Sequence, residues 1–426
     1  MLRKGCLLWF LLILLFAVNA EANVPVIVKV SSTVNISTIA SLLNGSVLDS
    51  IPEANTYLLS LPNLPLLTST LQLLGVQWID ANKFMTLPGI VPVAMLSVPA
   101  NVAPDWYKYQ PAMQLIRSNS AQAYSTGRAI VVADINSQVD YGHPALVGHL
   151  TSGYDFVANT SSSAATLNQS SAGFLDDQSS AGFLDQSSAG FLDQSSAGFL
   201  DNSRIGILSE LLNPNEGYSH GTLCAGVIAA VAPDAMIMPL RAFDDNGNAD
   251  AFTLAKAIRY AAQHGAQVLN MSFGTLKDVK VLREAIQYAQ QKNVILIASA
   301  GNNNTSSPQY PASYSGVSGV AATDLLDHKG WFSNYGSSGV NVYLDAPGVN
   351  IISPYPGNRY SIVSGTSFSA PAVAGAVALV RSLKATNATS YVSNNVVKID
   401  KQNPNYVGKL GVGRVDVLNA VKATAK

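Results

Sequence analysis

Two segments of this 426-residue chain carry side chains that fit nucleophilic catalysis. Ser367 lies in Gly365–Pro371, directly before the small apolar run 372–380. A helix that begins here would direct its free N–H groups and its positive end at a developing negative charge. His220 opens another run of small residues, and the glycine that follows it permits close approach. A serine and a histidine fit the nucleophile and the general base of acyl transfer.

A third segment ends an apolar strand with an amide side chain. Asn302 follows Ala300 and Gly301, after the β-type run 294–297. An amide N–H at a strand end can donate a hydrogen bond to an oxyanion. Either Ser367 or His220 alone would be read as an ordinary capping or surface residue. The three segments together favour a catalytic site.

These segments resemble the motifs of the subtilisin-like serine proteases, the subtilase family, and the resemblance runs from about residue 110 to residue 421. It implies a secreted serine endopeptidase that acts on polypeptides and requires no cofactor. Ser367 would be its nucleophile, His220 its general base and Asn302 its oxyanion donor. The turn 247–249 would form one wall of the cleft. The residues expected to bind substrate are Ser272, Phe273, Gly274, Ala300 and Gly301.

The aspartate motif of the family is altered in this chain. Counting back without a gap from Asp140 and from His143-Pro144 places Asn136 where the family has its catalytic aspartate. Asp134 lies two residues earlier and faces the same side of a strand as Asn136. A carboxylate inside such an apolar strand is expected to be buried and to need a partner.

Three interpretations of this alteration remain open. Asn136 could orient His220 by a hydrogen bond, as asparagine does in papain-like proteases. A shift of two residues could bring Asp134 into that role. The site could also be impaired, so that the protein binds peptides without efficient cleavage. The count without a gap favours Asn136 at the position of the family's catalytic aspartate. Asp134 is then expected to lie nearby and to support the site electrostatically.

The elements that must position these residues alternate between apolar strands and amphipathic helices from about residue 106. Continuous apolar strands separated by helices predict a mostly parallel sheet covered on both faces, hence a three-layer α/β domain over 106–426. The pattern over 24–80 is βαββαβ, which predicts a small ferredoxin-like α+β module. By resemblance, the module at 23–85 is an inhibitory propeptide and a partner of the peptidase. Residues 86–105, with four prolines, read as a linker in which self-processing is expected, between about 81 and 105.

The amino terminus predicts export. Residues 1–22 combine a basic start, an apolar run of ten residues and small residues near Ala20, which is typical of a secretory signal sequence. The run is shorter than a membrane-spanning helix requires, so no stable membrane insertion is expected after its removal. Cys224 is then the only cysteine left, and a small buried hydrophobe is a better interpretation of it than a catalytic thiol.

The composition and the acidic residues limit which ligands the protein is expected to bind. Only 12% of the residues are charged and the formal net charge is −1, which excludes a basic footprint for nucleic acid. No metal site is predicted. Calcium remains possible at Asp244, Asp245 and Asp250, although a solvated turn is preferred, and Ala145 stands where many relatives have an acidic calcium ligand.

The octamer QSSAGFLD occurs four times between residues 169 and 201. A stacked repeat element or an aspartate array that binds calcium would be a functional interpretation. A tandem duplication tolerated in a surface loop is preferred, because closure entropy grows only slowly with loop length.

Overall fold

The computed structural model describes residues 23–88, 91–97, 102–161, 216–336 and 342–425. They fall into two compact units, the first ending at Lys83 and the second beginning at Phe84. The signal sequence predicted over 1–22 and the octamers at 169–201 lie outside the described residues. Within the described part of the chain, no helix is long and apolar enough to cross a membrane.

The first unit is a four-stranded sheet with two short helices, in the strand order β2-β3-β1-β4. The pairs β1–β3, β1–β4 and β2–β3 are antiparallel, which is the arrangement of a split βαβ module. Its core is built from apolar side chains of strands and helices, among them Val28, Ile39 and Leu59. A 3-10 turn spans Pro52–Ala54. The other elements are β1 Val24–Val30, α2 Ile36–Leu42, β2 Ser46–Ile51, β3 Thr56–Leu61, α3 Ser69–Leu73 and β4 Val76–Ala81.

The second unit is organised around a ten-stranded sheet in the order β18-β19-β15-β14-β13-β12-β7-β10-β8-β9. Every pair from β19 to β8 is parallel, and only the two outermost pairs are antiparallel. The strands are β7 Val131–Asn136, β8 Tyr154–Asp155, β9 Thr160–Ser161, β10 Met236–Arg241, β12 Val268–Met271, β13 Ile295–Ser299, β14 Val317–Thr323, β15 Leu344–Pro347, β18 Val396–Val397 and β19 Arg414–Val415.

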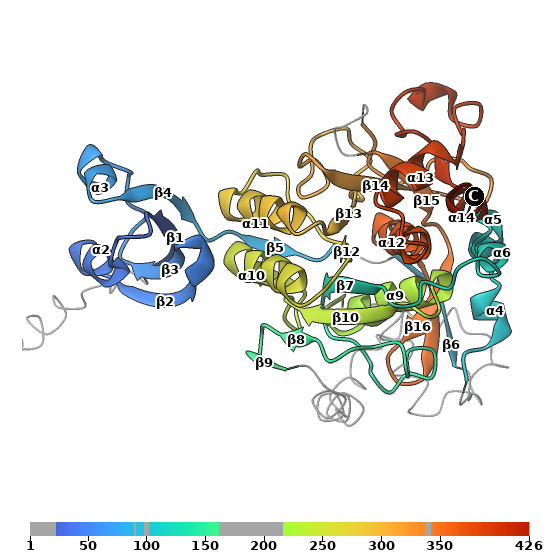
Figure 1. Cartoon of the computed structure of the whole chain (residues 1–426), viewed down its shortest axis with the longest axis horizontal. Coiled ribbons are helices and arrows are strands. Elements are labelled where there is room, and N and C mark those ends of the chain that lie inside the picture. Colours follow the sequence, from blue (N-terminus) through green and yellow to red (C-terminus); the bar gives the residue numbers. More distant parts are fainter. Residues whose placement is uncertain (1–22, 89–90, 98–101, 162–215, 337–341, 426) are drawn as a thin grey trace, which may run out of the picture. The chain divides into compact units, whose positions relative to one another are not determined.

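Helices cover both faces of this sheet, which confirms the predicted three-layer α/β fold (Figure 1). On one face α9 (Glu216–Val231) and α12 (Thr366–Ser382) pack against each other and against the central strands. On the other face lie α10 (Ala251–Gln263) and α11 (Lys280–Gln291). Every residue from Thr366 to Val380 is buried, because α12 runs through the core. The shorter helices are α4 Asp105–Lys108, α5 Pro111–Leu115, α6 Ser118–Ala121, α13 Ala388–Asn394 and α14 Val417–Thr424, with a 3-10 turn at Pro404–Tyr406.

The stretch 86–105, predicted as a linker, instead contributes strands to the second unit. Strand β5 (Phe84–Thr86) pairs antiparallel with β11 (Asn248–Asp250). Strand β6 (Val91–Ser97) pairs antiparallel with β17 (Arg359–Ser364), whose other neighbour is β16 (Ile351–Tyr355). The prolines do not prevent this pairing, because an edge strand tolerates residues that cannot donate to the ladder.

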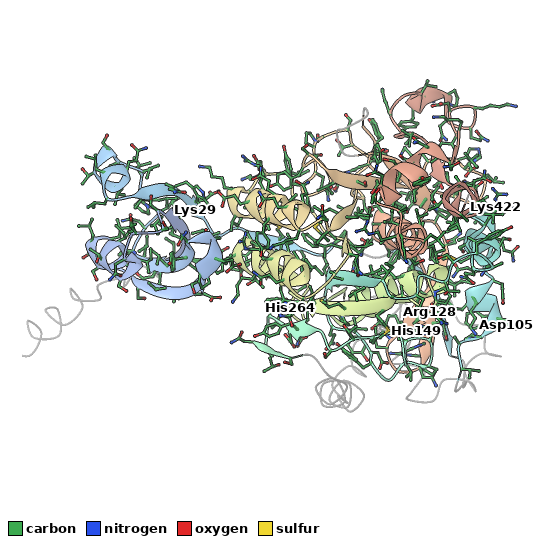
Figure 2. The ribbon with its side chains drawn as sticks, viewed as in Figure 1. Lys29, Asp105, Arg128, His149, His264 and Lys422 are labelled. Atoms are coloured by element: carbon green, nitrogen blue, oxygen red, sulfur yellow. The ribbon has the colours of Figure 1, made fainter. Side chains whose placement is uncertain are left out.

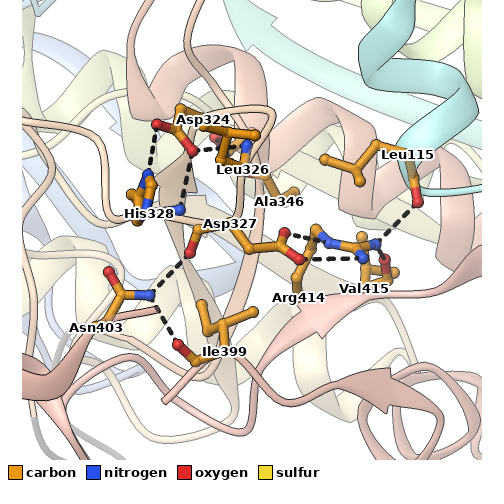
Figure 3. A network of polar contacts seen from close by, with 11 residues as sticks. Leu115, Asp324, Leu326, Asp327, His328, Ala346, Ile399, Asn403, Arg414 and Val415 are labelled. Carbon is orange, nitrogen blue, oxygen red and sulfur yellow. Dashed lines mark hydrogen bonds and ion pairs between the residues drawn. The ribbon is translucent and has the colours of Figure 1, made fainter. Parts of the chain in front are cut away.

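Charged side chains such as Arg128 and Lys422 extend into solvent, but some ionic groups are buried (Figure 2). Arg414 of β19 donates to the Asp327 carboxylate at 2.5 Å and to the carbonyl of Leu115 at 3.0 Å (Figure 3). Asn403 donates to the carbonyl oxygens of Asp327 and Ile399, each at 2.8 Å. This network ties the C-terminal edge of the sheet to the loop at 324–328 and to α5.

Candidate active site

Three neighbouring parallel strands bring the predicted segments to one edge of the sheet. Strand β7 ends at Asn136, β12 leads into Ser272, and β13 leads into Asn302. The carboxyl ends of parallel strands meet at the same edge, where open α/β sheets bind their ligands. Helices α9 and α12 bring His220 and Ser367 to this edge from the covering layer.

Ser367 is the second residue of α12, and its carbonyl is held from outside the helix. Pro371, four residues later, has no N–H to donate to this carbonyl. The carbonyl oxygen instead accepts from the Ser272 hydroxyl at 2.9 Å and from the Cys224 thiol at 3.3 Å. The first turn of α12 is therefore fixed to the segment after β12 and to α9.

His220 lies in α9 and is completely buried. Its Nδ1 is 2.7 Å from Oδ1 of Asn136, which also accepts from the backbone N–H of Ser137 at 2.9 Å. An amide oxygen can only accept, so Nδ1 is the protonated nitrogen and Nε2 carries the lone pair. Burial lowers the pKa of His220 to about 3, because the buried ring loses the hydration that favours its charged form. The ring is therefore a neutral base in this arrangement.

Asp134 stands behind Asn136 and does not contact the histidine through any hydrogen bond within the described chain. Its carboxyl accepts from Asn136 Nδ2 at 3.3 and 3.4 Å, and from Asn270 Nδ2 at 2.7 Å. Asn270 is its register partner on β12. Burial raises the pKa of Asp134 to about 7, although both amide donors lower it. These contacts turn the Asn136 amide so that its oxygen faces His220.

The nucleophile and the base are not hydrogen-bonded to each other in this structure. The Ser367 hydroxyl donates to the carbonyl of Ser272 at 3.4 Å. Within the described part of the chain, the buried Nε2 of His220 has no hydrogen-bond partner. Catalytic hydrogen bonds are often long before substrate binds and tighten in the reacting complex. Nε2 is thus the free acceptor that a general base needs.

Cys224 is one turn beyond His220 in α9 and is completely buried. Its sulfur lies 3.6 Å from Nδ1 of His220 and donates to the Ser367 carbonyl. Burial raises the pKa of the Cys224 thiol well above its ordinary value. A neutral, buried thiol is a poor nucleophile. Its contacts are those of a packing residue that also helps to hold Ser367.

Asn302 is positioned by Thr366, the residue before the nucleophile. Its Oδ1 accepts from the backbone N–H of Thr366 at 2.9 Å and from the Thr366 hydroxyl at 2.7 Å. The same hydroxyl accepts from the N–H of Gly301 at 3.1 Å. With the oxygen occupied in this way, Nδ2 is left as the group that can donate. An oxyanion donor would need such a free amide N–H near the start of α12.

The residues predicted to bind substrate form two nearly buried segments on either side of this edge. Ser272, Phe273 and Ala300 are completely buried, backbone included. Gly274 and Gly301 have no side chain, and Gly301 has a φ of 106°, in the region that favours glycine. Of the five residues only Gly274 is partly exposed, and it lines a cavity.

A segment of the chain itself lies along the opposite wall. Phe84–Thr86 pairs with Asn248–Asp250, and the N–H of Leu87 donates to the carbonyl of Gly247 at 2.8 Å. This is the turn predicted as the far wall of the cleft. Thr86 and Pro88 line a cavity together with Gly274 and Asn302.

A later part of the chain, β6, pairs with the strand that leads to the nucleophile. Val91 is the register partner of Ser364, which lies three residues before Ser367. The chain therefore pairs with the turn at 247–250 before residue 88 and with β17 after residue 90. Both of these partners, the turn and β17, belong to the second unit.

The acidic residues considered for calcium have other partners. The Asp244 carboxylate accepts from the N–H groups of Asn246 and Asn248, as in a tight turn. Asp245 pairs with Arg241, and Asp250 caps α10 by accepting from Thr253. Among the described residues, no three acidic, histidine or cysteine side chains are placed to hold a metal ion together.

Sequence reasoning did not single out Asn270, Thr366 or Pro371 as parts of the site. Asn270 could have been found, because it is a polar residue inside the apolar run 268–271, the same signal that marked Asp134. Thr366 and Pro371 are visible in the serine motif, but their effects depend on contacts with distant segments.

The sequence of this chain is similar to those of known proteins. A sequence profile described as Subtilase family matches residues 127–403. Thermitase of Thermoactinomyces vulgaris is 31% identical over 331 residues, which covers 75% of this chain and 98% of the relative. Thermophilic serine proteinase of Bacillus sp. (strain AK1) is 35% identical over 268 residues, which covers 61% of this chain and 53% of the relative.

Solved structures show the same fold at lower identity. Fervidolysin from Fervidobacterium pennivorans, a keratinolytic enzyme related to subtilisin, aligns with a TM-score of 0.67 and 23% identity over 94% of this chain and 61% of its own. The epidermin leader peptide processing serine protease from Staphylococcus aureus aligns with a TM-score of 0.67 and 18% identity over 95% of this chain and 99% of its own. At these identities the likeness concerns the fold alone.

Proposed function

Because this chain belongs to the subtilase family, a family of serine proteases, we propose that it is a secreted endopeptidase whose nucleophile is Ser367. The observation that carries this proposal is the convergence of Ser367, His220 and Asn302 at one edge of the parallel sheet. Export is supported by the signal-like sequence of residues 1–22.

In the first half of the reaction, the Ser367 hydroxyl attacks the scissile carbonyl and His220 Nε2 takes its proton. The oxyanion is stabilised by Asn302 Nδ2 and by the backbone N–H at the start of α12. His220 then gives the proton to the leaving amine, and an acyl-enzyme remains. In the second half, water attacks the acyl group with His220 again as the base, which releases the carboxylic acid and restores Ser367.

Asn136 takes the place of the orienting carboxylate in this scheme. Its oxygen accepts from His220 Nδ1 at 2.7 Å, so the correct tautomer is favoured without a negative charge in contact with the ring. Asp134 acts one step further away by holding the Asn136 amide in its orientation. An imidazolium would be stabilised less by an amide than by a carboxylate, so a lower turnover than in relatives with aspartate is expected.

We further propose that the first unit is a propeptide and that the enzyme cuts its own chain between Leu87 and Val91. This is narrower than the range of about 81 to 105 that the sequence indicates. It is supported by the pairing of Val91 with Ser364, three residues before Ser367, and by the cavity that Pro88 lines together with Asn302. The Ser367→Ala variant should keep its full mass on incubation. If it is trimmed as fast as the parent, another protease makes the cut.

A second candidate function is a subtilase-fold protein that binds peptides without cleaving them efficiently. The observation that favours it is Asn136 at the aspartate position. Labelling with a serine-directed fluorophosphonate separates the two functions. A protease should be labelled at Ser367 and should hydrolyse peptides, and His220→Ala should lose both properties. A folded, processed protein that takes no label on Ser367 and turns over no peptide would overturn the protease proposal.

A further inference from the structure

The slot between the two substrate-binding segments contains a side chain of the protein itself. Gln309 belongs to the loop before Tyr310, which forms an antiparallel bridge with Thr275. Its amide lies between Gly274 and Gly301. A Cβ atom on Gly274 would be 2.2 Å from Nε2 of Gln309, and one on Gly301 would be 1.9 Å from its Oε1. The amide therefore fills the gap that the two glycines leave.

This gap is where the reaction geometry places a substrate side chain. The attacked carbon must approach the Ser367 hydroxyl while its oxygen points at Asn302. The nearest room for the side chain of the same residue is the cavity that Asn302 lines together with Gly274 and Gln309. Two glycines at this place would otherwise leave an open slot for a large side chain.

Gln309 is held in the slot by a fixed neighbour. Nδ2 of Asn334 donates to Gln309 Oε1 at 3.0 Å and to the carbonyl of Ala300 at 2.9 Å. Oδ1 of Asn334 accepts from the N–H groups of Asn303 and Thr305. Asn334 is completely buried, and Gln309 is only 7% exposed. To leave the slot, Gln309 would have to break a hydrogen bond to a partner that cannot follow it.

We propose that Gln309 closes the side-chain pocket of this protease, so that it cleaves after small residues such as glycine, alanine, serine or proline and rejects large ones. The inference rests on the proposed function, because it assigns the substrate preference of the Ser367 site. Gln309 itself lines the adjoining cavity of about 340 Å³, together with Gly274, Asn302 and Pro88, and the last of these has a small side chain.

The test uses two peptides that differ only in alanine or phenylalanine before the scissile bond, with the processed protein as the enzyme. The parent should favour alanine by at least about 10-fold in kcat/KM, and Gln309→Ala should change the ratio in favour of phenylalanine by about 100-fold. Gln309→Met keeps the volume without the amide, so it should keep the preference for alanine. Gln290→Ala is the matched control, because Gln290 also lies against a glycine, Gly316, but on α11, away from the cleft.

The proposal is overturned if the parent cleaves after phenylalanine as well as after alanine, or if Gln309→Ala leaves the ratio unchanged. A failure of the proposed function has a different signature, namely no turnover of either peptide and no label on Ser367. In that case product-like peptides ending in alanine or phenylalanine are bound to each variant and Kd is measured. If the parent binds the alanine peptide more tightly than the phenylalanine peptide and Gln309→Ala shifts the ratio of Kd values toward phenylalanine, the closed pocket is supported. If the parent binds both peptides with equal affinity, the closed pocket is overturned. Thermal unfolding verifies that each variant is folded.

Discussion

The effect of Asp134→Asn on the free energy of unfolding should have opposite signs at pH 4 and at pH 8. Burial raises the pKa of this carboxyl from 3.8 to about 7, so the folded state binds its proton more tightly than the unfolded state does. The stabilisation from the protonated form is complete below about pH 4 and is lost as the pH rises to about 7. A difference of about 3 in pKa corresponds to about 4 kcal/mol.

The variant lacks this titration. At pH 4 it should be less stable than the parent by about 1–3 kcal/mol, because the new amide would place a donor against Asn136 Nδ2 or Asn270 Nδ2. At pH 8 the parent has lost about 4 kcal/mol, and the variant should be the more stable protein. Asp345, a second buried carboxyl with a raised pKa, is present in both proteins and cancels from the difference.

The assay is urea unfolding of both proteins in the Ser367→Ala background, which prevents self-cleavage, with tryptophan fluorescence as the signal. Asp105→Asn is the control, because Asp105 is exposed at the start of α4, and its effect should stay within about 0.5 kcal/mol at either pH (Figure 2). If the stability difference caused by Asp134→Asn is the same at pH 4 and pH 8 to within about 1 kcal/mol, the carboxyl is not desolvated as described.

Three further predictions concern catalysis. Asn302→Ala should lower kcat by about 10²- to 10³-fold with little change in KM, and an unchanged kcat measured in steady state would remove Asn302 from the oxyanion site. Asn136→Asp should raise the pKa of His220, because it places a negative charge next to the ring. The acid limb of the pH profile of kcat/KM should therefore move up by about 1–3 pH units. An acid limb that does not move would show that residue 136 does not contact the ring in the working enzyme. Asp134→Asn should lower kcat by less than about 10⁴-fold. A loss of about 10⁴-fold is known for a trypsin-like enzyme in which asparagine replaces the aspartate in direct contact with the histidine, so a loss that large here would mean a direct role for Asp134.

Elements with strong local patterns could be predicted closely from the sequence. The apolar run 268–271 is strand β12, and the helix expected after Gly365 is α12. Helix α3 begins only at Ser69, although apolar residues start at Leu64, because Pro65 lies early in this run and the cap is Thr68, whose hydroxyl accepts from the N–H of Leu71. A proline early in a periodic run and a capping residue within it together shift the start of a helix.

Features that depend on distant segments could not be predicted. Strand β6 has no recognisable period, and its partner β17 lies more than two hundred residues away in the chain. Gln309 reads as an ordinary loop residue, because its role arises only when Gly274 and Gly301 approach it from two strands. Asn136 could be placed at the orienting position by counting, whereas its contact with His220 and its distance from Asp134 required coordinates.

The proline in α12 has a consequence for how the enzyme should fail on heating. Since Pro371 leaves the Ser367 carbonyl outside the internal ladder of the helix, the nucleophile takes its position from Ser272 and Cys224, which belong to other elements. A slight loosening of that packing would displace the hydroxyl while the rest of α12 keeps its own hydrogen bonds. Activity would therefore decline at temperatures where the circular dichroism of the helices is still native, and cooling before unfolding would restore it.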